Sequence, residues 1–323
     1  MIVVTGAGGF IGSHLVEALL TRGRKVLALD LGEEVPASLA GNSLNERFQY
    51  ASCDLRRPES LFTVIPRDVD VIYHLAATVG VDSYIRDPLG TIDNNVLGTR
   101  NVLEACVKRN IGVVYVSSSE VYGKNPDVPW NETADRVLGN PSIDRWSYAT
   151  SKGLCEHMVN AVHKRFGVTT TVVRPFNVYG SRQRPSFIIP AAVHSVLNGR
   201  RPVVYDDGTQ TRCFTYIDDL VNGLLVCVES KAAAGETFNL GSSNETTIND
   251  AIQTVLKVCG SSLQPIRFDT KKQFGDTYED IERRVPDVSK AHRVLGWRAN
   301  TSLVEGVTKT VAWAKSHPEW LSS

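Results

Sequence analysis

The stretch that decides the fold is Ile2-Val3-Val4-Thr5-Gly6-Ala7-Gly8-Gly9-Phe10-Ile11-Gly12. Its first residues form the short, apolar, β-branched run that is typical of a buried strand, and apolar residues with helical spacing follow it. Gly6 permits a tight turn, Gly9 lets the backbone approach a pyrophosphate, and Gly12 lets a helix pack on the strand. The stretch therefore predicts a strand, a turn and a helix that bind a dinucleotide, with its pyrophosphate at the helix N-terminus.

A second predicted strand, Lys25 to Leu29, ends in Asp30. A carboxylate at this position accepts hydrogen bonds from the hydroxyls of a ribose and repels a 2′-phosphate. We therefore expect NAD rather than NADP as the cofactor, although Arg22 and Arg24 lie nearby in the sequence.

Strands and helices continue to alternate along the chain. Strands are expected from Phe48, over Val69–Leu75 and over 113–117, and a long helix is expected from Asn94 to about Arg109. This alternation implies a parallel sheet with right-handed crossovers. The expected fold class is α/β, a Rossmann-type doubly wound parallel sheet with a smaller, mixed α/β region for substrate binding at the C-terminal end.

The expected division is an NAD-binding domain over 1–175, with a returning segment near 210–240, and a substrate domain over 176–323 that is interleaved with it. In the second part a strand is expected over Thr237–Leu240. Helices are expected there over Phe187–Leu197, Leu220–Val228, Ile248–Val258, Ser289–Leu295 and Leu303–Lys315.

Composition limits the function classes. The chain has 323 residues, 42% of them hydrophobic and 22% charged, with a net charge of zero, so nothing favours binding to nucleic acid or to an anionic membrane. Apolar runs are too short for a membrane helix, and Met1 precedes a core strand without room for a signal peptide. The six cysteines are scattered, which favours reduced thiols over disulfides or a zinc site. We expect a cytoplasmic protein.

A cluster of hydroxyls and an acid, Ser117-Ser118-Ser119-Glu120-Val121-Tyr122-Gly123, follows the strand predicted at 113–117. Ligands of open parallel sheets bind at the carboxyl ends of the strands, so the cluster is a candidate reaction site. In the alternative interpretation the serines bond the loop backbone and Glu120 points into solvent.

A helix that begins near Arg145 carries Tyr148 and Lys152 one turn apart, on one helical face. An ammonium beside a phenol favours the phenolate, so we expect Lys152 to lower the pKa of Tyr148 and make it a serviceable base at neutral pH. The alternative is an exposed helix face. We expect His74, at the end of another strand, to be structural rather than catalytic.

Together these motifs resemble the extended short-chain dehydrogenases/reductases of the nucleotide-sugar epimerase/dehydratase group, over nearly the whole chain. The resemblance implies that Ser118, Tyr148 and Lys152 form the triad for hydride transfer at C4 of a sugar. It also implies a homodimer through the long helices. The cofactor site it implies consists of Gly6, Gly9, Phe10, Ile11, Gly12, Asp30, Asp54, Leu55, Leu75, Ala76, Ala77, Asn95, Tyr148 and Lys152.

The same resemblance extends to Arg174-Pro175-Phe176-Asn177-Val178-Tyr179-Gly180 and to Arg212-Cys213-Phe214-Thr215. It implies that Asn177 and Arg212 hold the nucleoside diphosphate of the substrate and that Tyr205 lies near its base. Arginine suits a diphosphate because its fork bonds two oxygens at once. The alternative for Arg212 is a surface ion pair with a nearby aspartate.

Residues beyond the triad carry the choice of reaction. Ser118-Ser119-Glu120 resembles the UDP-glucuronic acid decarboxylases, and so does Tyr278–Asp287, where Arg284 precedes a residue and a proline. The resemblance implies that Arg284 and Ser119 bind the substrate's carboxylate, whereas Glu120 positions the sugar or manages a proton. The alternative for Arg284 is an ion pair with an acid of its own segment, Glu279, Asp280 or Glu282.

Two stretches depart from relatives of that branch. The loop Gly180–Pro185 is short, as in epimerases, and Thr78-Val79-Gly80 replaces the cysteine of the apiose/xylose synthases. We expect NAD-dependent oxidative decarboxylation of UDP-glucuronic acid to UDP-xylose or the UDP-4-keto-pentose. The alternative is a 4-epimerase of UDP-glucuronic acid or another nucleotide sugar. A 4,6-dehydratase and a non-catalytic NAD-binding protein are less favoured.

Overall fold

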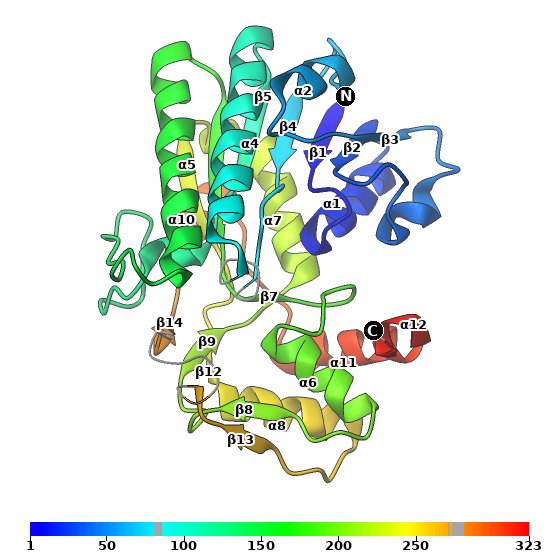
Figure 1. Ribbon diagram of the computed structural model, residues 1–323, viewed down its shortest axis with the longest axis vertical. Coiled ribbons are helices and arrows are strands. Elements are labelled where there is room, and N and C mark those ends of the chain that lie inside the picture. The colour runs from blue at the N-terminus through cyan, green and yellow to red at the C-terminus, as the bar shows by residue number, and fades with distance from the viewer. Residues whose placement is uncertain (81–85, 271, 273–280, 323) are drawn as a thin grey trace.

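The computed structural model describes residues 1–80, 86–270, 272 and 281–322 (Figure 1). Within these residues a parallel seven-stranded sheet forms the centre, in the order β11-β6-β5-β4-β1-β2-β3. The strands are β1 (Ile2–Thr5), β2 (Val26–Asp30), β3 (Phe48–Ser52), β4 (Val71–His74), β5 (Gly112–Val116), β6 (Thr170–Pro175) and β11 (Glu236–Leu240). The order reverses between β1 and β4, which is where such sheets bind dinucleotides. The predicted Rossmann-type α/β fold is confirmed.

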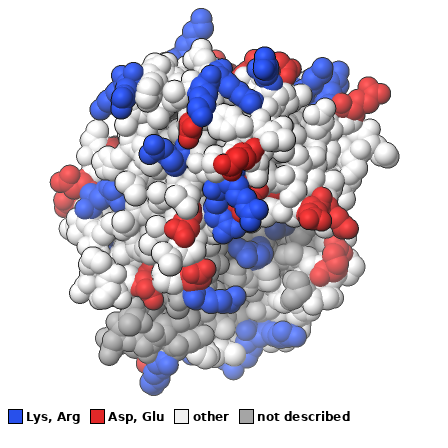
Figure 2. Space-filling view, turned by 45° about the horizontal axis from the view of Figure 1, so that its top comes forward, with Lys and Arg blue, Asp and Glu red and all other residues white. Residues whose placement is uncertain are grey.

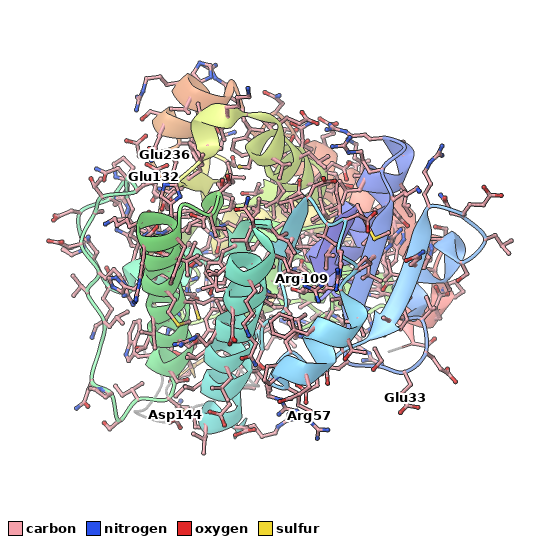
Figure 3. The ribbon with its side chains drawn as sticks, turned by 90° about the horizontal axis from the view of Figure 1, so that it is seen from above. Glu33, Arg57, Arg109, Glu132, Asp144 and Glu236 are labelled. Atoms are coloured by element: carbon pink, nitrogen blue, oxygen red, sulfur yellow. The ribbon has the colours of Figure 1, made fainter. Side chains whose placement is uncertain are left out.

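Helices cover both faces of this sheet, which is why strands β1, β2 and β5 are almost continuously apolar. Side chains alternate along β1, so that Ile2 and Val4 pack in one core and Val3 in the other. Helices α1 (Phe10–Thr21) and α7 (Ile217–Glu229) lie on the first face. Helices α2 (Pro58–Val64), α4 (Pro88–Arg109) and α5 (Arg145–Phe166) lie on the other, where α4 and α5 run side by side (Figure 3).

Most predicted elements agree with the structure, and the largest difference concerns α4. This helix begins at Pro88, well before the predicted start at Asn94. Asp87 caps it by accepting a hydrogen bond from the Gly90 amide at 2.8 Å, and proline is well tolerated in the first turn. The strand from Phe48 ends at Ser52, and α2 and β6 were not predicted.

The second part of the chain forms a smaller mixed region at one end of the sheet (Figure 1). Its helices are α6 (Ile188–Leu197), α8 (Ile248–Cys259), α11 (Leu303–Lys315) and α12 (Pro318–Leu321), whereas α10 (Ser289–Leu295) packs beside β11 of the central sheet (Figure 1). Its strands are β7 (Val178–Tyr179), β8 (Val203–Tyr205), β9 (Thr211–Cys213), β10 (Thr215–Tyr216), β12 (Glu245–Thr247), β13 (Ile266–Phe268) and β14 (Arg283–Arg284). Short 3-10 helices are η1 (Ala37–Asn42), η2 (Ser119–Tyr122) and η3 (Lys231–Ala233). The division near residue 175 stays a prediction.

The surface is electrostatically mixed. On the face that Figure 2 shows, basic and acidic side chains are interspersed, in keeping with the balance of 35 basic and 35 acidic residues. Among the described residues, no helix is both long and apolar enough to cross a membrane.

Candidate active site

The candidate site is built on the η2 turn, which we define as Ser118–Gly123 and which follows directly on β5. Ser118 caps the 3-10 helix, because its Oγ accepts a hydrogen bond from the Glu120 amide at 3.2 Å. Gly123 ends the turn with a φ of 63°, and a side chain there would overlap the carbonyl oxygen of Val137. The hydroxyl cluster and Glu120 therefore lie at the carboxyl end of β5, as predicted.

Helix α5 brings Tyr148 to this turn, where its side chain is buried and bonded to Ser118. The expectation that the phenol has a lowered pKa is wrong for this structure. Burial raises the pKa of Tyr148 well above its ordinary value, and the negative charge of Glu120 adds to that effect, although the hydrogen bond from Ser118 opposes it. The resting side chain is therefore a neutral phenol.

Lys152, one turn further along α5, is also buried. Its Nζ donates a hydrogen bond to the carbonyl oxygen of Val116 at 2.8 Å, which ties α5 to the last residue of β5. Burial lowers the pKa of Lys152 to about 8, whereas Cys155 and Glu156 act to raise it. The ammonium is therefore charged at neutral pH but easily deprotonated.

Glu120 is enclosed by arginines rather than exposed to solvent. Arg284 Nη1 lies 2.6 Å from its Oε1, and Arg145 Nη2 lies 3.7 Å from its Oε2. Burial by itself raises the pKa of Glu120. The charges of Arg284 and Arg145, the hydrogen bond from Arg284 and the charge of Arg212 outweigh that effect and lower the pKa to about 2. Glu120 is therefore ionised, and the surrounding group of charges is positive.

A three-stranded sheet explains how Arg284 and Arg212 reach Glu120 from distant parts of the chain. β14 pairs with β9 in parallel, and the register sets Arg284 beside Arg212. Both side chains are buried, and Arg212 Nη1 donates to the carbonyl oxygen of Thr211 at 2.8 Å. Of the predicted alternative partners of Arg284, Glu279 and Asp280 lie outside the described residues. The carboxylate that the structure gives it is Glu120.

The glycine loop at the carboxyl end of β1 has the geometry that a dinucleotide requires. Gly6 has a φ of 66°, and a Cβ there would come within 2.8 Å of the Ala76 backbone. A Cβ at Gly12 would overlap the carbonyl oxygen of Gly6. Helix α1 begins at Phe10 behind Gly9, which supplies no side-chain cap, so the first amides of the helix face the loop. These residues fit a bound pyrophosphate.

Two of the other predicted cofactor segments lie beside this loop, Asp30 and the residues that follow β4. Asp30 Oδ2 accepts a hydrogen bond from the Gly8 amide at 2.8 Å, which sets the carboxylate beside the loop. Asp54, next to Leu55, forms two hydrogen bonds with Arg56, at 2.9 and 2.8 Å, so this carboxylate is engaged by its own segment. Leu75, Ala76 and Ala77 follow β4.

His74 and Asn95 cross-link the elements around the loop. His74 is buried between the hydroxyls of Thr5 and Thr99, at 2.8 and 3.0 Å. Burial, with the charge of Lys152, lowers the pKa of His74 to about 3, so the ring is neutral, and its two hydrogen bonds agree with the predicted structural role. The buried Asn95 side chain bonds the Thr78 amide at 2.9 Å and the Ser151 hydroxyl at 3.0 Å, which links α4 to α5.

The comparison with known families agrees with this geometry. Residues 2–241 match the model of the NAD dependent epimerase/dehydratase family. The chain belongs to this family. NAD is therefore its cofactor, and the glycine loop and Asp30 fit that role. The predicted resemblance to nucleotide-sugar enzymes with a short-chain dehydrogenase/reductase fold is confirmed.

Relatives within the NAD-dependent epimerase/dehydratase family catalyse different reactions. The chain is 34% identical to a UDP-N-acetyl-alpha-D-glucosaminuronate decarboxylase of Bacillus cytotoxicus, with 96% of each chain covered. It is also 34% identical to UDP-glucuronic acid decarboxylase 1 of Arabidopsis thaliana, over 96% of this chain and 69% of the relative. The crystal structure of UDP-glucuronic acid 4-epimerase from Bacillus cereus, in complex with UDP-glucuronic acid and NAD, is 31% identical. It has a TM-score of 0.86 and covers 98% of this chain and 99% of its own.

Two predicted substrate residues, Asn177 and Tyr205, belong to segments other than the η2 turn. Asn177 has a φ of 39°, and its Nδ2 donates to the carbonyl oxygen of Cys213 at 3.4 Å, so it joins the segment after β6 to the end of β9. Tyr205 ends β8 with a half-exposed ring. Their contacts with a nucleoside diphosphate stay predictions.

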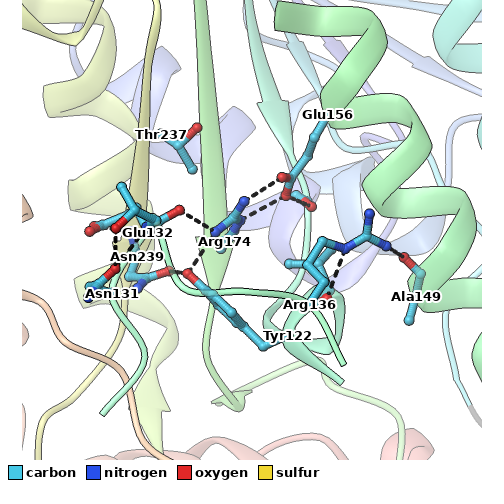
Figure 4. Close-up of polar contacts among 12 residues, drawn as sticks. Tyr122, Asn131, Glu132, Arg136, Ala149, Glu156, Arg174, Thr237 and Asn239 are labelled. Atoms are coloured by element: carbon cyan, nitrogen blue, oxygen red, sulfur yellow. Dashed lines mark hydrogen bonds and ion pairs between the residues drawn. The ribbon is translucent and has the colours of Figure 1, made fainter. Parts of the chain in front are cut away.

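Sequence reasoning gave Arg145 no role of its own, yet this residue lies beside Glu120. Its position three residues before Tyr148 on the same helix was the available signal, because residues with this spacing share a helical face. The buried Glu156–Arg174 ion pair, at 2.6 Å, was also missed (Figure 4). Neither residue type is expected in a core, so only the folded structure brings them together.

Proposed function

We propose that the protein decarboxylates UDP-glucuronic acid through a 4-keto intermediate in an NAD-dependent reaction. The observation that carries the proposal is the ionised Glu120 held by Arg284 at 2.6 Å, within a buried group of arginines at the carboxyl end of β5. Such a group favours a substrate that brings a carboxylate as well as a diphosphate. Relatives named decarboxylases of two different UDP-uronic acids add support.

The first step is the oxidation of the sugar at C4, for which bound NAD supplies the hydride acceptor. Tyr148 accepts the proton of the 4-hydroxyl, and Ser118 hydrogen-bonds the phenol oxygen. Because burial favours the neutral phenol, formation of the tyrosinate needs a nearby positive charge. Lys152, charged below about pH 8 and located on the same face of α5, contributes that charge.

The second step follows from the new carbonyl. With C4 oxidised, the sugar is a β-keto acid, whose carbon–carboxyl bond breaks with its electron pair delocalised into an enolate. Carbon dioxide leaves, and a proton added at C5 restores the ketone. Arg284 and Ser119 bind the carboxylate and hold the breaking bond perpendicular to the carbonyl plane.

Glu120 is not the resting donor of the C5 proton, because its pKa of about 2 leaves it ionised. An ionised carboxylate accepts hydrogen bonds, so Glu120 orients a sugar hydroxyl or the water that supplies the proton. It also limits how firmly Arg284 holds the substrate's carboxylate, since both carboxylates share that guanidinium. Moderate binding helps because tight binding of the carboxylate in the ground state would raise the barrier to its loss as carbon dioxide.

A 4-epimerase of a UDP-uronic acid is the second candidate. The loop from Gly180 to Pro185 is short and held against α1, with Ser181 Oγ 3.0 Å from His14 Nε2 and Arg182 2.7 Å from Glu17. Epimerisation needs the same oxidation, followed by rotation of the keto sugar and return of the hydride to its other face. The 31% identical Bacillus cereus structure is a relative with this activity.

One assay separates the candidates. The protein is incubated with NAD and UDP-glucuronic acid, and in parallel with UDP-N-acetylglucosaminuronic acid, while released carbon dioxide and nucleotide-sugar mass are followed. We expect carbon dioxide and a matching mass loss from at least the first sugar. Formation of UDP-galacturonic acid without mass loss overturns the decarboxylase in favour of the epimerase. Tyr148→Phe is expected to abolish either activity without loss of NAD binding.

A further inference from the structure

We propose that Arg136 is a positioning residue that fixes the distance between the η2 turn and α5. It acts through the backbone, since it contacts the residues that directly follow Glu120, Tyr148 and Lys152 in the chain. The inference rests on the proposed function of those three side chains.

The guanidinium of Arg136 bridges the two elements (Figure 4). Its Nε donates to the carbonyl oxygen of Val121 at 3.0 Å, and its Nη2 donates to that of Ala149 at 3.2 Å. Val121 belongs to the η2 turn and Ala149 to α5. A planar fork with donors in fixed directions sets the spacing of two backbones in a way that a flexible ammonium does not.

Gly153 gives the guanidinium its place on α5. A Cβ built on Gly153 would overlap the guanidinium carbon and both terminal nitrogens of Arg136. Glycine is the least favourable helix residue after proline, and Gly153 lies in the interior of a helix that extends from Arg145 to Phe166. Space for the Arg136 guanidinium is therefore a physical reason for a glycine at position 153.

The segment that carries Arg136 is itself anchored to the turn. The Val137 amide donates to the Tyr122 carbonyl oxygen at 3.1 Å, and the Lys124 amide donates to that of Val137 at 2.7 Å. Arg136 is therefore held by backbone bonds beside the turn that it supports, unlike a freely rotating surface arginine.

A second arginine, Arg174, contacts Tyr122 of the η2 turn and, through Glu156, Ser117, which directly precedes the turn. Arg174 pairs with Glu156 at 2.9 and 2.6 Å and donates to the Tyr122 hydroxyl at 2.8 Å (Figure 4). Glu156 in turn accepts a hydrogen bond from Ser117 at 2.6 Å. The ion pair thus fixes Ser117 and Tyr122, and Arg136 adds the direct contact between the backbone of the turn and the backbone of α5.

The test uses kcat, KM and chemical rescue with whichever UDP-sugar the wild-type enzyme converts. Arg136→Ala is expected to lower kcat by about 100-fold, because an error of about 1 Å in the position of catalytic groups has that effect. The KM of the sugar should change far less, since Arg136 is not placed at the substrate. Added guanidinium ion, well below denaturing concentrations, should restore much of kcat by occupying the vacated place, whereas sodium chloride at equal ionic strength should not.

Gly153→Ala supplies the matched control for the rescue. Arg136→Ala/Gly153→Ala should have the same low kcat but no response to guanidinium, because the new methyl group fills the place. Arg109→Ala removes another arginine that donates to backbone carbonyls, those of Ile65, Pro66 and Phe62, and should leave kcat unchanged. If Arg136→Ala does not fold, kcat is measured for Arg136→Lys instead. Lysine keeps the positive charge but lacks the planar fork of donors, so kcat should still fall.

If kcat is unchanged in Arg136→Ala, or if guanidinium rescues the single and double variants equally, the role of Arg136 is wrong but the proposed function still stands. A wild-type protein that converts none of the UDP-sugars overturns the proposed function and the role of Arg136 with it.

Discussion

Arg284 Nη1 lies 2.6 Å from Glu120 Oε1, so the arginine predicted to bind the substrate's carboxylate already holds a carboxylate of the protein. The Nε of Arg284 is buried and has no hydrogen-bond partner among the described residues. A buried donor without a partner is costly, which favours its satisfaction by a ligand. In the proposed function, Glu120 and the substrate's carboxylate would share one guanidinium, and their competition can be measured.

Glu120→Gln is expected to lower kcat on UDP-glucuronic acid by roughly 100-fold, the usual effect of misplacing a reacting group by about 1 Å. The affinity for UDP-glucuronic acid should stay the same or increase, because glutamine leaves the charge of Arg284 to the substrate. Steady-state kinetics and calorimetric titration measure the two effects. Glu245→Gln is the control, since Glu245 forms an exposed pair with Arg283 at 2.8 Å. Unaltered turnover in Glu120→Gln contradicts the role of Glu120.

Arg284→Ala is expected to discriminate between acidic and neutral sugars. Loss of one partner of a buried, hydrogen-bonded charge pair costs about 2–5 kcal/mol, or roughly 30-fold or more in kcat/KM for UDP-glucuronic acid. Binding of UDP-glucose, which has no carboxylate, should change much less. Arg283→Ala, at the exposed neighbouring position, should leave both nearly unchanged. Equal losses for the two sugars would show that Arg284 does not act by binding the substrate's carboxylate.

Some parts of the site are determined by local sequence, and others only by the fold. The glycine loop and the η2 turn were predictable because each follows a strand end, and β1 and β5 are marked by β-branched runs. The proximity of Arg284 to Glu120 depends on β14, a strand of two residues paired with β9. No periodicity identifies so short a strand, so Arg284 was predicted by resemblance alone.

Charge environments were the least predictable feature. A Tyr-x-x-x-Lys pair on one helical face predicts a lowered phenol pKa, but complete burial of Tyr148 reverses the direction. Burial depends on which elements cover the helix, and here they include the η2 turn and the segment that carries Arg136. Arg136, Arg145 and Arg174 likewise look like surface residues until the structure packs them around α5.

Glu156→Gln tests how much the buried ion pair below the η2 turn contributes to stability. The variant leaves the charge of Arg174 buried without its carboxylate, which typically lowers the free energy of unfolding by about 3–5 kcal/mol. Glu104→Gln removes a carboxylate from the exposed Glu104–Lys108 pair, also at 2.6 Å, and should cost at most about 1 kcal/mol. Urea unfolding followed by circular dichroism measures both. Similar losses in the two variants would contradict a structural role for the pair.

The pH dependence of activity should follow Lys152, whose pKa is lowered by burial to about 8. If its ammonium stabilises the tyrosinate, kcat falls as the pH rises through about 8. Stability should change in the opposite direction. The pKa of Lys152 in the folded protein lies below its ordinary value of 10.5, so between these values the unfolded chain binds more protons. A higher pH within this range therefore increases the contribution of Lys152 to the free energy of unfolding.

The expected result is an alkaline loss of kcat with an unchanged circular dichroism spectrum and no loss of NAD binding. In Lys152→Arg, whose guanidinium stays charged, any residual activity should lack this alkaline limb. If the alkaline loss of kcat persists in Lys152→Arg, or coincides with unfolding, then Lys152 is not its cause.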